Sequence, residues 1–270
     1  MLFFYDLNIP MKRFFAFGCS FTYYSYPTWA DIVGSQYDEY YNLGMLGCGN
    51  EFIENMVHEA DFFKNLTSDD TVAVLLTGYS RNDSFIEGQW RGRGNVFAEA
   101  NEQVYTPGWF QDHWSLEQGV LTTWRAERNI RQLLTSKGCN FRILAAMPML
   151  LDNALNHYDS LDTPNAVSAK LLEISQDYDR RTEPRGGQYL VDSLKKRQDL
   201  YEFEGLGIDL HPTVSMHLQF VKQELPELYN PEMQMLADQW HTMVSRISKE
   251  NWNNPVFARA RGRRIGTLTF

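Results

Sequence analysis

The sequence predicts an α/β fold in which a parallel sheet is sandwiched between helices. Short apolar runs bounded by turn residues alternate along the chain with longer amphipathic stretches. Continuous apolar runs of this length are typical of parallel strands that are buried on both faces. Strands that alternate with helices along the chain form a sheet with helices packed on it.

Each element follows from its local pattern. The expected strands are four apolar runs, at residues 14–17, 40–45, 72–77 and 141–147. Residues 51–64 and 116–134 are expected to form helices, because each stretch is polar on one side and apolar on the other. A further amphipathic helix is expected from about Thr213, directly after Pro212.

The chain is expected to form one domain over residues 1–270, with two additions. Residues 151–204 carry many charges and are interpreted as an insertion of helices and loops. Residues 251–270 lack acidic side chains and carry a cluster of arginines. We expect this basic tail to be solvated or docked on a partner, with phosphate binding as the less favoured alternative.

Composition narrows the class of protein. A chain of 270 residues that is 43% hydrophobic can bury a sizeable core. The formal charge of -9 argues against general nucleic-acid binding and favours a small neutral or sugar-like substrate. Three scattered cysteines indicate neither a disulfide framework nor a cysteine zinc site. Since no run approaches the length of a membrane span, we expect a cytoplasmic protein.

The segment "FGCSFT" at residues 17–22 presents a serine where the first strand ends. Gly18 allows the backbone to turn sharply, and Ser20 then lies at the edge where open α/β sheets bind their ligands. A serine after a strand is also a frequent helix cap, which is the structural alternative. Cys19 is a rival nucleophile, but neighbouring residues point to opposite sides, so only one of the pair can face a shared base.

Asp209 and His211, in "GIDLHPTVSMHLQFV" at residues 207–221, supply the partners that a serine nucleophile needs. A histidine takes the proton of the hydroxyl, and a carboxylate behind it holds the correct tautomer. Ser20, His211 and Asp209 are therefore the predicted catalytic residues. His217 is expected to be a structural or surface group on the helix that follows.

Two further segments offer donors for the negative charge that develops on the substrate oxygen. They are "NLGMLGCGN" at residues 42–50 and "LLTGYSRND" at residues 75–83. The N–H groups of Ser20 and Gly47 and the side-chain amide of Asn82 form the predicted oxyanion hole. Each segment alone is an ordinary loop or turn signal.

These four segments, in this order, resemble the SGNH hydrolase superfamily, also called GDSL-like esterases and lipases. Ser20 matches the nucleophile, Gly47 and Asn82 the oxyanion positions, and Asp209 and His211 the last motif. "SFTYYSYPTWAD" at residues 20–31 resembles a subgroup of uncharacterised SGNH-like proteins from phages and marine bacteria. The resemblance implies a three-layer α/β/α, flavodoxin-like fold and hydrolysis of esters, often acetyl groups on carbohydrates, without a cofactor.

The sequence departs from the family pattern at three positions. Cys19 replaces the usual acidic residue, and Asp209 precedes His211 by two residues where three are more usual. Two extra residues separate Gly78 from Asn82, so Ser80 or Arg81 are alternative oxyanion donors.

Residues 85–114 are rich in glycine and aromatic side chains. Because they follow the third motif directly, this loop is expected to overhang the site, with Trp90, Arg91 and Trp109 as substrate-binding residues. The alternative is a small aromatic core under a long loop.

The sequence thus predicts a serine esterase that acts on a small ester, such as an O-acetyl group on a carbohydrate. Its partner is then a small-molecule or glycan ester, with neither nucleic acid nor membrane involved. The alternative is a non-catalytic module that keeps the fold and recognises a glycan or a viral assembly partner. If the protein is of phage origin, we expect it to be associated with the virion. A thiol-dependent transferase that uses Cys19 is a third, less favoured hypothesis.

Overall fold

The computed structural model describes residues 11–98, 101–147, 149, 165–182, 190, 200–204, 207–247 and 262–265. Its centre is a parallel sheet with the strand order β2-β1-β3-β6. The strands are β1 (Arg13–Gly18), β2 (Glu39–Asn42), β3 (Asp70–Leu76) and β6 (Asn140–Ala145). This order matches the first four positions of the flavodoxin-like 2-1-3-4-5 arrangement. The predicted α/β class and its four predicted strands are confirmed.

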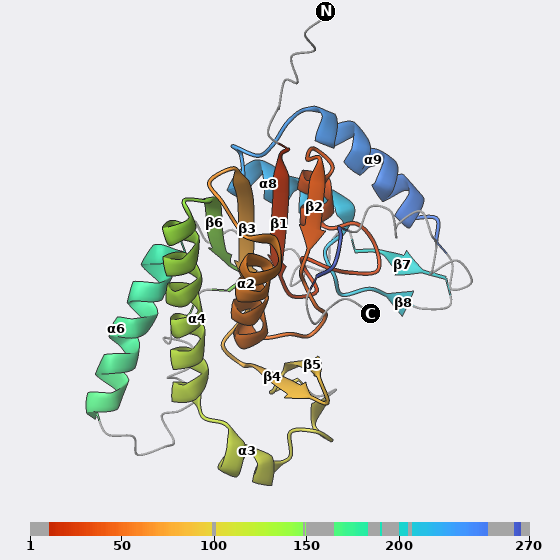
Figure 1. Cartoon of the computed structure of the whole chain (residues 1–270). Helices are drawn as coiled ribbons and strands as arrows, with labels where there is room; N and C mark the ends of the chain where they lie inside the picture. The colour runs from red at the N-terminus through yellow and green to blue at the C-terminus, as the bar shows by residue number, and fades with distance from the viewer. Residues whose placement is uncertain are drawn as a thin grey trace, which may run out of the picture.

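Helices cover both faces of the sheet, as Figure 1 shows with α2 in front of the strands and α8 behind them. One group packs together as α2 (Asn50–Lys64), α4 (Leu116–Lys137) and α6 (Asn165–Arg181). The other group consists of α1 (Trp29–Gly34), α8 (Val214–Glu224) and α9 (Glu232–Val244). The three predicted helices correspond to α2, α4 and α8. The protein is therefore a three-layer α/β/α structure.

The core lies where β1 crosses the middle of the sheet. Phe14, Phe15 and Phe17 are fully buried, and Trp29 and Phe220 pack against each other at 5.6 Å between ring centroids. An apolar run can be buried along its whole length only when both faces of the strand are covered. The central position of β1 thus explains its continuous apolar pattern.

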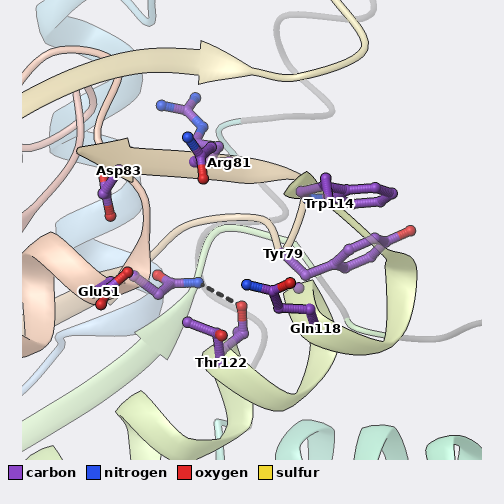
Figure 2. Close-up of a pocket in the computed structure, with 11 residues that line it drawn as sticks. Glu51, Tyr79, Arg81, Asp83, Trp114, Gln118 and Thr122 are labelled. Carbon is purple, nitrogen blue, oxygen red and sulfur yellow. Dashed lines mark hydrogen bonds between the residues drawn. The ribbon is translucent and has the colours of Figure 1, made fainter. Parts of the chain in front are cut away.

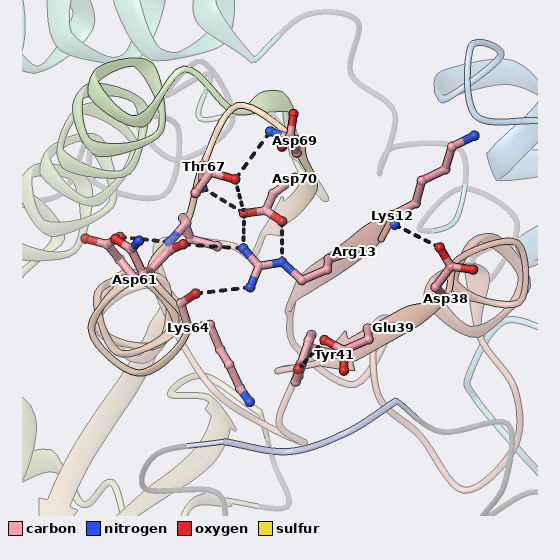
Figure 3. A network of polar contacts seen from close by, with 12 residues as sticks. Lys12, Arg13, Asp38, Glu39, Tyr41, Asp61, Lys64, Thr67, Asp69 and Asp70 are labelled. Atoms are coloured by element: carbon pink, nitrogen blue, oxygen red, sulfur yellow. Dashed lines mark hydrogen bonds and ion pairs between the residues drawn. The ribbon is translucent and has the colours of Figure 1, made fainter. Parts of the chain in front are cut away.

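Arg13 and Asp70 join β1 to β3 at the edge where both strands begin (Figure 3). The Arg13 guanidinium donates to both carboxylate oxygens of Asp70 at 2.6 Å, and the Thr67 N–H donates to the same carboxylate at 2.7 Å. Arg13 also donates to the Lys64 carbonyl at the end of α2. This cluster therefore ties a helix end to two strands.

Two small hairpins lie outside the main sheet. One pairs β4 (Arg81–Ile86) with β5 (Gln89–Asn95), and the other pairs β7 (Glu202–Phe203) with β8 (Gly207–Ile208). The sequence predicted turn residues at Asn82 and Asp83, and this local assignment was wrong because both lie within β4. The turn lies instead at Glu87 and Gly88, where both residues have positive φ, as a two-residue hairpin turn requires.

The short helix α3 (Pro107–His113) is capped by Thr106, whose hydroxyl accepts from the Trp109 N–H. Of the predicted insertion at residues 151–204, the described part includes α6, which is joined to α4 through Glu127. This buried carboxylate binds both Arg131 and Arg181. Residues 151–164, 183–189 and 191–199 of the insertion lie outside the described residues.

The described part of the basic tail, residues 262–265, lies along the free edge of β2. The Arg263 N–H donates to the Tyr40 carbonyl, and the Asn42 N–H donates to the Arg263 carbonyl. A Cβ at Gly262 would stand 2.4 Å from the Asn42 nitrogen, so only glycine allows this approach. These four residues are docked on their own chain, where the sequence led us to expect solvent or a partner. They cover an edge strand that would otherwise be open to pairing.

Within the part of the chain that the structure describes, no helix is both long and apolar enough to cross a membrane.

Candidate functional site

The candidate site lies at the edge where the parallel strands end. β1 pairs with β2 on one side and with β3 on the other. After β1 the chain adds β2 on one side of it, and it then crosses over to add β3 on the other side. In open α/β sheets, ligands bind outside the carboxyl ends of the strands at such a switch point. The Ser20 segment follows β1 directly, and the predicted oxyanion segments follow β2 and β3.

Ser20 lies in a turn and not at the start of a helix. The N–H groups of Thr22 and Tyr23 both donate to the Cys19 carbonyl, whereas α1 begins only at Trp29. The helix-cap alternative for Ser20 is therefore wrong. Ser20 is 7% exposed and Cys19 only 1%, so the serine is the more accessible of the two candidate nucleophiles.

A buried network of hydrogen bonds holds the turn that carries Ser20 in place. The Thr28 hydroxyl and the Asn42 side-chain amide both donate to the Thr22 carbonyl, at 2.6 and 2.8 Å. The Asp31 carboxylate accepts from the Thr28 N–H and the Tyr40 hydroxyl, and burial raises the pKa of Asp31 to about 6. Because these polar groups satisfy one another, the turn that carries Ser20 is held in one conformation.

Asp209 and His211 form the pair that the sequence predicted. His211 Nδ1 lies 2.9 Å from Asp209 Oδ1, and the same oxygen accepts from the His211 N–H at 3.0 Å. A carboxylate only accepts, so the proton of the neutral ring lies on Nδ1 and Nε2 is left as the acceptor. Asp209 reaches the ring across two residues because its side chain folds back onto the backbone of His211.

The Ser20 segment and the Asp209–His211 pair are in direct contact through aromatic rings. Tyr24 stacks on His211 with ring centroids 3.8 Å apart, and Phe21 meets the same ring edge-on at 6.3 Å. The turn after β1 and the segment before α8 are therefore brought together, although the chain separates them by most of its length. Among the described residues, no hydrogen bond joins Ser20 to His211.

Gly47 lies in the turn after β2 with φ at 70°, a conformation that favours glycine. The β4–β5 hairpin rests on this turn: the Gly94 N–H donates to the Gly47 carbonyl at 2.7 Å, and Arg81 donates to the Cys48 carbonyl. A Cβ at Gly92 would stand 2.5 Å from the Cys48 nitrogen. The segment predicted to overhang the site does cover the second motif, as a hairpin.

Asn82 lines a small polar cavity between β4 and the helices α2 and α4 (Figure 2). Its lining includes Arg81 and Gln118 but neither Ser20, Gly47 nor His211. Asn50 in the same cavity uses its amide on the Thr77 carbonyl and the Thr123 hydroxyl, which leaves no N–H for a substrate. Asn82 and His211 therefore line different cavities.

Asp83 fixes the hairpin to α2. Its carboxylate accepts from the Gly49 N–H at 2.6 Å and the Phe52 N–H at 2.9 Å, which caps the start of that helix. Burial raises the pKa of Asp83 to about 6, against the lowering effect of these two bonds. A residue that the sequence analysis treated as part of a turn thus positions the cover of the site.

The predicted substrate-binding residues do not form one group: Trp90 and Arg91 are neighbours on β5, whereas Trp109 lies on α3. Trp90 packs on Phe52 and Phe85, and Arg91 forms an ion pair with Glu87 at 3.6 Å. Trp109 packs in a separate aromatic group with three partners, Tyr105, Phe110 and His113. The small-core alternative describes Trp109 better than a shared platform does.

A solved structure of a lipolytic protein is similar to this chain. It is the crystal structure of a member of the lipolytic protein G-D-S-L family from Veillonella parvula DSM 2008. The similarity covers 80% of this chain and 97% of that chain, with a TM-score of 0.41 and 12% identity. Values this low carry no argument about activity. No protein-family model and no curated protein sequence matches the chain.

Sequence reasoning missed Tyr24 and the capping role of Asp83. Tyr24 lies inside the quoted segment "SFTYYSYPTWAD", but nothing local distinguishes it from Tyr23 or Tyr26. Within the described residues, no group of histidine, cysteine, aspartate and glutamate side chains is arranged to hold a metal ion.

Proposed function

We propose that the protein is a serine hydrolase that cleaves small esters, with Ser20 as nucleophile, His211 as base and Asp209 as its partner. One observation carries the proposal. The hydrogen-bonded Asp209–His211 pair is stacked against the turn that presents Ser20, at the switch point of the sheet. Acyl transfer needs a serine close to an imidazole of fixed orientation, and the contact between these two segments supports that pairing.

The chemistry proceeds in two halves. Nε2 of His211 takes the proton of the Ser20 hydroxyl as Oγ attacks the ester carbonyl, and Asp209 stabilises the imidazolium. The N–H groups of Ser20 and Gly47 are the proposed donors to the oxyanion. His211 then protonates the leaving alcohol, and a water molecule repeats the sequence on the acyl-enzyme. Asn82 is the least supported donor, because it lines the separate cavity of Figure 2.

The proposed substrate is an O-acetyl group on a carbohydrate. This choice rests on the resemblance of the four motifs to GDSL-like esterases and on the negative charge of the chain. Arg91, which is exposed on β5, is the proposed contact to a polar substrate.

A fluorophosphonate probe and an ester assay together test the nucleophile. Wild type should hydrolyse 4-nitrophenyl acetate and carry the probe on Ser20 by mass spectrometry. Ser20→Ala should lose both properties while its circular dichroism is unchanged. Cys19→Ser is the matched control and should keep both.

Other outcomes would favour one of the two alternative hypotheses. An active Ser20→Ala together with an inactive Cys19→Ser would support the thiol hypothesis. If wild type neither turns over nor takes up the probe, the non-catalytic module is favoured. The observation that favours the non-catalytic module is the absence of a Ser20–His211 hydrogen bond among the described residues. Binding of acetylated and deacetylated glycans by calorimetry is then the next measurement.

A further inference from the structure

Tyr24 contacts both members of the Asp209–His211 pair at once. Its ring lies over the imidazole with centroids 3.8 Å apart and 23° between the planes. Its hydroxyl donates to Asp209 Oδ1 at 3.2 Å, the oxygen that also accepts from the histidine. A side chain with two such contacts restricts both the tilt of the ring and the position of the carboxylate.

The surroundings of Tyr24 are built to keep it in place. Tyr26, which is 1% exposed, meets the Tyr24 ring edge-on at 4.9 Å and donates to the His211 carbonyl at 3.4 Å. Tyr26 in turn packs on Tyr201, whose carbonyl accepts from the Asp209 N–H. The tyrosine and the carboxylate are thus braced by the same neighbours.

The electrostatic environment also favours Tyr24 beside Asp209 and His211. Burial, together with the nearby Asp209 carboxylate, raises the pKa of Tyr24, so its hydroxyl remains a donor at neutral and mildly alkaline pH. The face of an aromatic ring attracts a cation that lies over it. An imidazolium at His211 would therefore be stabilised by the stacked ring.

We propose that Tyr24 is a positioning residue that holds the proton of neutral His211 on Nδ1 and keeps Nε2 directed at the nucleophile. This inference rests on the proposed function for its catalytic meaning, but the tautomer itself can be measured without turnover. Tyr24 acts through His211 and does not touch the reacting atoms.

Nitrogen-15 NMR of the histidine rings tests the proposal, with His211 assigned from the signal that His211→Gln lacks. In wild type above the titration range, Nδ1 should be protonated and Nε2 unprotonated. Tyr24→Leu removes both contacts and should give a mixture of the two tautomers. Tyr24→Phe keeps the stack, so it should keep the tautomer while the Nδ1 signal moves. Tyr23→Leu is the matched control and should leave His211 unchanged, because the Tyr23 ring packs under Arg264.

Kinetics supply the second readout. Tyr24→Leu should lower kcat roughly tenfold to 100-fold with little change in KM, as expected for one hydrogen bond to a charged group together with a cation–π contact. Tyr24→Phe should recover part of that loss. A wild-type tautomer in Tyr24→Leu would overturn the inference. If that variant does not fold, an Nδ1 signal unchanged in Tyr24→Phe would overturn it. Absence of esterase activity with the tautomer change intact would instead overturn the proposed function alone.

Discussion

At the scale of single residues, His211 and His217 have opposite environments. His211 is partly exposed beside Asp209, whereas His217 on α8 is 1% exposed. Burial, with a smaller contribution from the nearby His211, lowers the pKa of His217 to about 3. His217 is therefore neutral at pH 7 and has no access to a substrate, in line with the structural role expected for it.

The first prediction separates the two histidines. His211→Ala should lower kcat/KM by about 100-fold to 10,000-fold, the usual contribution of a general base. His217→Leu replaces the buried imidazole with an apolar side chain that stays buried, and it should keep most of the activity. Steady-state kinetics on one activated ester measure both. Full activity in His211→Ala beside an inactive His217→Leu would show that the base is misassigned.

The second prediction concerns Asn82. Removal of an oxyanion donor costs about 100-fold to 1,000-fold in kcat. Because the cavity lined by Asn82 lacks Ser20, Gly47 and His211, we expect Asn82→Ala to cause a much smaller loss. A loss within the donor range would show that the amide does reach the substrate oxygen. Thr122→Ala, on the opposite wall of the same cavity, controls for effects of the cavity itself.

At the scale of elements, the β4–β5 hairpin positions the second motif. Three contacts hold it there: the Asp83 cap on α2, the Gly94–Gly47 hydrogen bond and the close approach of Gly92 to Cys48. The Arg81–Cys48 hydrogen bond and the packing of Trp90 on Phe52 add to these contacts, and the position of the hairpin depends on them together.

The third prediction tests this contact. Gly92→Ala places a methyl group within 2.5 Å of the Cys48 backbone nitrogen, which cannot move as a flexible side chain would. The hairpin must shift away from Gly47, and we expect lower kcat and faster amide hydrogen exchange in residues 45–49 and 89–95. Gly108→Ala in α3 meets nothing within 4 Å and should behave as wild type. Unchanged exchange in Gly92→Ala would mean that the hairpin does not support the turn.

At the scale of the whole molecule, the ion pair that stabilises the sheet and the candidate site lie at opposite ends of the strands. The Arg13–Asp70 cluster joins the strands where they begin (Figure 3). Ser20 lies just after β1 ends. Asp70 is 1% exposed. Loss of its charge would leave the Arg13 guanidinium only partly solvated and without its ion-pair partner.

The fourth prediction follows from this separation. Asp70→Asn should lower the free energy of unfolding by about 2 to 3 kcal/mol, less than for a fully buried pair because Arg13 is partly exposed. Activity of the folded fraction should not change. Asp69→Asn, the exposed neighbour, is the control. Urea denaturation measures the first quantity, and a fall in kcat without a fall in stability would contradict the assignment.

The sequence by itself determined the elements and the local chemistry. Each strand of the sheet overlaps a mainly apolar run of consecutive residues, and Asp209 and His211 are two residues apart, so short-range pattern was enough to predict them. The same holds for α2, α4 and α8, whose amphipathic period lies within each segment.

The tertiary structure decided which segments meet. Tyr24 reaches His211 and Asp209 across most of the chain, the hairpin docks through Asp83, and residues 262–265 lie along β2. Such contacts depend on the order of strands in the sheet and on close approach at glycines, which no local pattern encodes. For the same reason Asn82, one residue from the Asp83 cap, lies in a separate cavity from His211: it falls at an irregularity in the pairing of β4 with β5, between Arg81 and Asp83, which the motif around it does not encode.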